Sequence, residues 1–383
     1  MRSWVRGVGI ACAAGVLAAC FSGLQLNRVG SSTADDGAII VSFWAESRSG
    51  SPAVGMSEAD FEIYEDGELI STFESKQKLV PQPATFELQS LLLLDMSGSI
   101  TGSGDVAALK DAAATYVQQM PDTMELGIYY FDGRANIQPL LPLDAESTDM
   151  WWQFGKDAWK MSNRELALRA IDQLDTVCDD PQAPCDPSTN LHGAILEGLY
   201  LLGGGLGSFL DTGGQGSSDE KFGSGSWNGE VGSTSAGSLV VFSDGTDRAG
   251  RISEDLVLND IKSTSHAVYS IGLGGEVDRR FLKRVGKDGA VFAADTTTIV
   301  EAFSEVASTV ADRSNSYYAL VYCSPSRQGS HEVRVKGTWN GKSGSMDVAF
   351  SADDFDDARV PYCDPEVYVR ALLGKDSDTN TKE

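Results

Sequence analysis

Between residues 88 and 313, continuous apolar runs alternate with segments whose apolar residues recur every three to four positions. An apolar run such as 91–94 is typical of a parallel strand covered on both faces, and the recurring pattern is typical of an amphipathic helix. The predicted strands are 91–94, 126–131, 137–143, 239–242 and 267–273, and the predicted helices are 106–117, 147–177, 191–202, 252–262 and 298–311. This alternation predicts an α/β domain over 88–313, with a doubly wound, mostly parallel sheet.

The segments on either side of this domain, 38–87 and 314–365, alternate apolar and polar residues with the period of two that half-buried strands show. Asp66 and Gly67 separate two such runs and predict a hairpin turn. Each flank alone has too few strands for an independent core. We therefore expect the two flanks to pack together as one small β-sandwich.

Three polar stretches are expected to lie outside these modules. Residues 20–37 are predicted to form a flexible tether, and 366–383 a tail whose last ten residues are disordered. The segment 203–237, rich in Gly and Ser, joins a predicted helix to a predicted strand. Its place in the topology predicts that it lies at the sheet edge opposite the carboxyl ends of the strands.

The first residues have the pattern of a targeting segment: a basic start, an apolar run over 7–17 and the sequence Leu-Ala-Ala-Cys ending at Cys20. This ending resembles the bacterial lipobox, which implies a signal peptide over 1–19 and acyl chains on Cys20. An ordinary secretory signal is the alternative. The apolar run is too short to span a bilayer, so we expect a lipid-tethered protein.

The cysteine count favours the lipidated form. Without the signal peptide five cysteines remain, and lipidation of Cys20 leaves four that can pair fully in an oxidising compartment. Four cysteines allow three connectivities. Proximity along the chain favours Cys178 with Cys185 and Cys323 with Cys363.

Composition narrows the function. The net charge of -25 argues against nucleic acid as a partner, because a phosphate backbone would be repelled. The three histidines lack the spacing that zinc sites show. The sequence has no Gly-x-Ser-x-Gly elbow and no phosphate loop. We therefore expect a binding protein, and not an enzyme.

Hydroxyl and carboxylate side chains follow the predicted strands where ligands collect in α/β sheets, at the strands' carboxyl ends. Asp95, Ser97 and Ser99 follow the first strand, Thr189 precedes a helix, and Asp244 follows another strand. Any one of them alone is better explained as a helix cap. Five on one edge of a sheet favour a metal site.

This set of five residues resembles the metal-ion-dependent adhesion site of the von Willebrand factor type A domain, over the whole of 88–313. The preceding Asp60-Phe61-Glu62-Ile63-Tyr64-Glu65-Asp66-Gly67 is similar to the β segment before such domains in bacterial secreted proteins, with Met56 where Leu is usual. The chain is thus identified as resembling a bacterial lipoprotein member of this family.

The resemblance implies that Ser97 and Ser99 bind the metal directly, that Thr189 does so directly or through water, and that Asp95 and Asp244 act mostly through water. Magnesium (Mg²⁺) is the expected cofactor, with Mn²⁺ or Ca²⁺ as alternatives, because such ions prefer oxygen ligands and Mg²⁺ retains waters. The expected partner is a protein that presents an Asp or Glu carboxylate to the ion.

The expected location is the bacterial cell envelope, where Phe21 after Cys20 mildly favours the outer membrane. A subunit of an envelope assembly or secretion machine is the second hypothesis. A metal-dependent hydrolase, in which the ion activates water, is the third.

Overall fold

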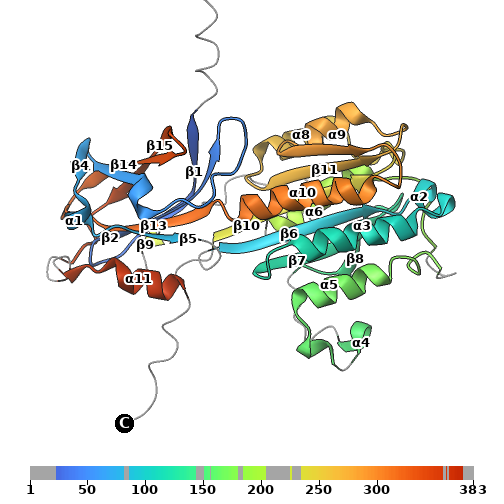
Figure 1. Ribbon diagram of the computed structural model, residues 1–383, viewed down its shortest axis with the longest axis horizontal. Helices are drawn as coiled ribbons and strands as arrows, with labels where there is room; N and C mark the ends of the chain where they lie inside the picture. Colours follow the sequence, from blue (N-terminus) through green and yellow to red (C-terminus); the bar gives the residue numbers. More distant parts are fainter. Residues whose placement is uncertain are drawn as a thin grey trace, which may run out of the picture. The chain divides into compact units, whose positions relative to one another are not determined.

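The computed structural model (Figure 1) describes residues 23–81, 86–143, 151–155, 157–179, 184–203, 225–226, 234–356, 359 and 362–373. The chain divides into two compact units: unit 1 comprises 1–80, 223–231 and 316–383, and unit 2 comprises 81–222 and 232–315. The predicted signal peptide with Cys20, most of the Gly-rich segment and the last ten residues lie outside the described ranges. No helix within those ranges has the length and apolar character needed to cross a membrane.

Unit 2 is built around one sheet, whose six described strands lie in the order β12-β11-β10-β6-β7-β8. They are β6 (Phe86–Asp95), β7 (Met124–Phe131), β8 (Gln138–Leu141), β10 (Thr234–Ser243), β11 (Ala267–Leu273) and β12 (Gly289–Ala293). All neighbours are parallel except β7 and β8. Counted along the chain within this sheet, the order is the doubly wound 3-2-1-4-5-6, so the predicted fold class is confirmed. Its switch point lies between β6 and β10.

Helices cover both faces of this sheet (Figure 1). The helices described in unit 2 are α2 (Gly98–Ser103), α3 (Val106–Gln119), α4 (Trp151–Phe154), η3 (Ala158–Lys160), α5 (Asn163–Asp172), α6 (Leu191–Leu202), α8 (Glu254–Ser263), α9 (Arg279–Val285) and α10 (Ile299–Ser314). Leu91 and Leu93 pack with α6, α8 and α9 in one core, while Leu92 and Leu94 are buried as well. Both faces of β6 are therefore apolar, as its uninterrupted leucine run predicts.

The single helix predicted over 147–177 is wrong. The described part of that range contains three short helical segments, with a left-handed backbone at Gly155 between the first two. A capping box then starts α5, because Ser162 accepts from the amide of Glu165 and the Glu165 carboxylate accepts from the amide of Ser162.

Unit 1 contains two sheets, β5-β13-β2-β1-β9 and β15-β14-β3-β4. The strands are β1 (Leu24–Thr33), β2 (Ala38–Ser47), β3 (Phe61–Glu65), β4 (Glu68–Ile70), β5 (Lys78–Pro81), β9 (Gly225–Ser226), β13 (Tyr317–Cys323), β14 (Ser330–Trp339) and β15 (Lys342–Ser351), with the short helices η2 (Glu58–Asp60) and α1 (Thr72–Ser75). Strands from the two flanks pair directly, β2 with β13 and β3 with β14. Val41 and Leu320 from one sheet share a core with Ile63 and Val335 from the other. The predicted β-sandwich is confirmed.

The flexible tether predicted over 20–37 is wrong for Leu24–Thr33, which forms β1. Leu24 and Leu26 are buried in the core of unit 1, and β1 pairs with β2 over most of its length. Among the remaining positions only Val29 is apolar in side chain, so the sequence shows no clear alternation there. The strand is ordered by pairing with β2 and by packing against β15, which is distant in the chain.

The first part of the predicted tail over 366–383 is helical, because α11 spans Pro365–Leu372. Tyr368 and Leu372 are buried on one face of this helix, and the Tyr368 hydroxyl donates to Asp36 Oδ1 at 2.6 Å. Packing against the β-sandwich of unit 1 therefore orders the segment.

Both predicted disulfides are present. Cys178 and Cys185 have their Cα atoms 4.9 Å apart, and Cys323 and Cys363 have theirs 6.0 Å apart. The second disulfide connects the end of β13 to the residues before α11, within unit 1.

Glycine at position 344 lets β1 pack against β15. A Cβ there would lie 2.1 Å from the carbonyl oxygen of Leu24, which is backbone and cannot rotate away. We expect Gly344→Ala to lower the free energy of unfolding of unit 1 by about 1–3 kcal/mol, measured by urea denaturation. Ser345→Ala, at the exposed neighbouring position, is the control. Equal stability of the two variants would contradict the integral role of β1.

His266 should make unit 2 less stable in acid. Burial, with the charge of Lys287 adding, lowers the pKa of His266 to about 4, and its Nδ1 accepts from the amide of Gly237 at 3.1 Å. The unfolded chain takes up this proton near pH 6.5 and the folded chain near pH 4, so stability is lost as the pH falls through that window. Urea denaturation at pH 7.5 and 4.5 should show about 2–3 kcal/mol more loss for wild type than for His266→Gln. Parallel losses would refute this.

Candidate metal centre

Asp95, the last residue of β6, is a fully buried carboxylate at the switch point of the sheet. Its Oδ1 accepts from the amide of Ser97 at 3.0 Å, and its Oδ2 accepts from the hydroxyl of Ser243 at 2.7 Å. Burial raises the pKa of Asp95 to about 6 in spite of these bonds. Among the described residues its hydrogen-bond partners are neutral, so none of them brings a positive charge to this carboxylate.

A line of oxygen atoms leads from Ser97 to Asp244. The hydroxyl oxygens of Ser97 and Ser99 are 3.2 Å apart, and the Ser99 hydroxyl donates to Asp244 Oδ1 at 2.8 Å. Neighbouring ligands of an octahedral Mg²⁺ ion, each about 2.1 Å from the metal, are separated by about 3.0 Å. These three side chains therefore lie at separations that suit one ion.

Thr189 reaches the same place from the loop before α6 and is 3% exposed. Its carbonyl oxygen accepts from the amides of Arg248 and Ala249, at 2.9 and 3.0 Å, in the loop that follows Asp244. The first and second loops also touch, because the amide of Gly98 donates to the carbonyl of Pro187 at 3.0 Å. Backbone hydrogen bonds thus hold the three predicted loops together.

A cleft of about 380 Å³ opens at this edge. Ser99, Thr189 and Asp244 line it, and the buried Asp95 and Ser97 connect to that lining through the contacts above. The structure therefore brings all five predicted residues together.

The cleft extends beyond the predicted loops. The residues after β11 and β12 line it too, including Gly274, Glu276 and Asp295. Burial raises the pKa of Asp244, and the charges of Asp105 and Glu276 add to this. The sequence signal for the β11 loop was the Gly-Gly pair at 274–275 directly after a predicted strand.

The donor set fits a hard divalent cation. It consists of two carboxylates and three hydroxyls, the oxygen ligands that Mg²⁺, Mn²⁺ and Ca²⁺ accept. The described residues contain no group of three or more His, Cys, Asp or Glu placed to hold a metal ion. A metal here would therefore depend on the hydroxyls, which add no charge.

Several solved structures resemble this chain. One is a von Willebrand factor type A protein from Catenulispora acidiphila, with 11% identity, a TM-score of 0.41 and coverage of 89% of this chain and 78% of that one. Manganese-loaded TRAP protein from Plasmodium vivax has 13% identity and a TM-score of 0.40, covering 73% and 99%. Proximal thread matrix protein 1 from the mussel byssus, with a zinc-occupied MIDAS motif, has 15% identity and a TM-score of 0.37, covering 60% and 48%.

These likenesses agree with the family resemblance drawn from the sequence, but at such identities and TM-scores they carry no argument about function. No family model and no curated protein matches the chain. The fold assignment rests on the strand order and connectivity of unit 2.

Ser243 is a site residue that the sequence did not single out, although it directly precedes Asp244. Its hydroxyl donates to Asp95 and accepts from the amide of Gly245 at 3.2 Å. We expect Ser243→Ala to weaken Mn²⁺ binding about tenfold in isothermal titration calorimetry, because it frees both Asp95 and the third loop. The matched control is Ser270→Ala, which removes another buried hydroxyl of the sheet, bonded to the carbonyl of Leu282 at 2.7 Å. Equal losses in both variants would show that only general stability is affected.

Proposed function

We propose that this chain captures a protein partner through a divalent cation held at the carboxyl edge of unit 2. The residues that would hold the ion are Asp95, Ser97, Ser99, Thr189 and Asp244. The observation that carries the proposal is the fully buried Asp95, whose described hydrogen-bond partners are neutral, beside a half-buried second carboxylate. A fully buried and a half-buried carboxylate without a cation are costly, and a divalent ion would offset that cost.

The arrangement of the oxygen ligands favours an ion that keeps one coordination position free for a partner. The two carboxylates balance two positive charges formally, and the hydroxyls add none. When bound, the ion supplies a coordination position that accepts a carboxylate oxygen. Ser99, Thr189 and Asp244 line the open cleft, so a partner's side chain can approach from solvent. We take magnesium as the ion, with Mn²⁺ or Ca²⁺ as alternatives.

The partner is proposed to be a protein presenting Asp or Glu, and nucleic acid is disfavoured by the net charge of -25. Binding is favoured over catalysis because no histidine is among the residues that line the cleft within the described chain. Glu276, a carboxylate at that cleft, has a side chain 87% exposed to solvent, unlike a tuned catalytic base.

We further propose that the protein is exported and anchored by lipid on Cys20 in a bacterial cell envelope, with the outer membrane favoured. The two disulfides support an oxidising compartment, because they pair four of the five cysteines that follow the predicted signal peptide. Cys20 is the fifth. The alternative role, as a subunit of an envelope assembly or secretion machine, would use the same metal-bridged contact.

The proposal is tested by Mn²⁺ titration of the purified protein, followed by crosslinking pull-downs from cell envelopes in Mg²⁺ or in chelator. Ser97→Ala and Asp244→Ala should weaken Mn²⁺ binding at least 100-fold and abolish the capture seen in Mg²⁺. Glu276→Gln is the control, because it removes a charge at the same cleft outside the five residues, and its affinity should stay within about threefold. Capture that is unchanged in chelator, or in Asp244→Ala, would refute a metal-bridged contact.

A further inference from the structure

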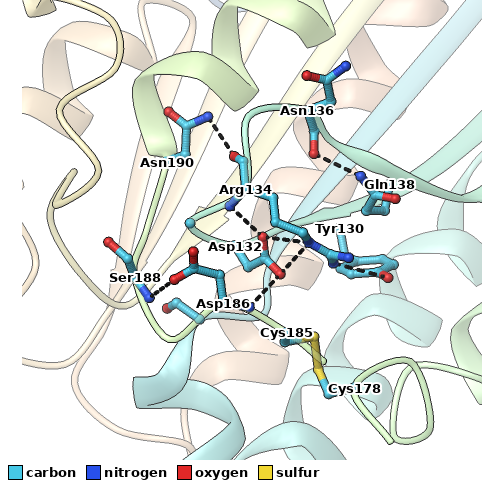
Figure 2. A network of polar contacts seen from close by, with 12 residues as sticks. Tyr130, Asp132, Arg134, Asn136, Gln138, Cys178, Cys185, Asp186, Ser188 and Asn190 are labelled. Atoms are coloured by element: carbon cyan, nitrogen blue, oxygen red, sulfur yellow. Dashed lines mark hydrogen bonds and ion pairs between the residues drawn. A yellow bond between two sulfur atoms is a disulfide. The ribbon is translucent and has the colours of Figure 1, made fainter. Parts of the chain in front are cut away.

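The turn that follows β7 holds a second buried carboxylate, which the metal centre does not use. Asp132 is 1% exposed (Figure 2). Its Oδ1 accepts from the amide of Arg134 at 2.8 Å, and its Oδ2 lies 2.8 Å from Arg134 Nε. The Arg134 guanidinium also lies over the Tyr130 ring, 5.6 Å from its centroid. The charge of Asp132 is thus compensated within the chain, and it does not compete for a cation.

The same residue holds both ends of the loop that carries Thr189. Asp132 Oδ2 accepts from the amide of Asp186 at 3.0 Å, and the Asp132 carbonyl accepts from the amide of Asn190 at 2.8 Å. The Asn190 side chain returns two bonds, to the carbonyls of Arg134 and Ala135 at 2.9 and 3.1 Å. Thr189 therefore lies between two fixed points.

Glycine at 133 allows this close approach. A Cβ there would lie 2.5 Å from Asp186 Oδ1 and 2.6 Å from Ser188 Cβ. The Gly133 carbonyl accepts from Nε and Nη2 of Arg251 at 3.2 and 3.0 Å, and Arg251 lies on the chain after the Asp244 loop. The turn after β7 thus contacts the segments that carry the second and third groups of the metal centre.

We propose that Asp132 is a positioning residue that fixes the 186–190 loop so that Thr189 stands ready for the cation before the cation arrives. This inference rests on the function proposed above. Groups that orient metal ligands from behind commonly change metal affinity 10- to 100-fold when they are replaced. The Asp132 carboxylate acts on the loop through the amide of Asp186, so its loss should free that end of the loop without removing any ligand.

The variant Asp132→Asn keeps the size of the side chain and removes its charge and one acceptor. We expect it to weaken Mn²⁺ binding by 10- to 100-fold in calorimetry. In metal-free protein, NMR hydrogen exchange at the amide of Asp186, which donates to the Asp132 carboxylate, should become at least tenfold faster. This second readout needs no metal.

The matched control is Asp288→Asn. Asp288 also accepts from a backbone amide, that of Val268 at 2.9 Å, and also pairs with an arginine, Arg313 at 3.4 Å. It directly precedes β12 and bonds to Val268 near the start of β11, at the opposite edge of the sheet from the metal centre. This variant should leave Mn²⁺ affinity and exchange at 186–190 unchanged.

Unchanged exchange and affinity in Asp132→Asn would overturn the inference, as would equal losses in both variants, which would indicate a general loss of stability. If Asp132→Asn does not fold, hydrogen exchange of the wild-type protein in chelator tests the inference. Protected amides at Asp186 and Asn190 would support a loop that is fixed without metal, and unprotected amides would overturn it. If wild type binds no Mn²⁺, the proposed function fails, and exchange alone then decides whether Asp132 holds the loop.

Discussion

The buried carboxylate of Asp95 is the constraint around which the functional edge of unit 2 is organised. A charge without solvent and without a cationic hydrogen-bond partner among the described residues is expensive. The surrounding chain supplies the amide of Ser97 to Oδ1 and the hydroxyl of Ser243 to Oδ2. The hydrogen bond from the Ser243 hydroxyl to Asp95 joins the ends of β10 and β6 across the switch point. The loop that carries Thr189 is bonded to the loops that follow both strands.

Much of the architecture could be predicted from local pattern. The run of leucines in β6 predicts that both faces of this strand are buried. The alternation of apolar and polar residues in the two flanks was sufficient to predict a shared β-sandwich. Strand β1 could not be recognised in the same way, because its two buried side chains, Leu24 and Leu26, stand at its start and most of the residues after them are polar. β1 is held in place by pairing with β2 and by packing closely against Gly344 of β15. Such tertiary contacts produce no hydrophobic periodicity in the sequence.

The candidate site divides in a similar manner. The five oxygen donors stand beside strand ends, so topology alone predicts that they converge. Asp132 could not be found by such reasoning, because it acts through the amides of Asp186 and Asn190, and any residue carries an amide. The candidate metal ligands can be recognised in the sequence by their residue types. The backbone hydrogen bonds that position them cannot, because they do not depend on side-chain identity.

The order of segments along the chain sets the order of assembly. Unit 2 is inserted between β5 and β13 of unit 1, and the pairing of β2 with β13 joins strands from opposite ends of the polypeptide. During vectorial synthesis, β2 and β3 can pair with β1 and β4, but they must wait for β13 and β14 while unit 2 emerges and folds. Closing that large loop is slow, since its entropy is lost before the distant pairing rewards it. The half-finished sandwich, with its open strand edges, is therefore the stage at which this protein is most exposed to aggregation and most dependent on chaperones.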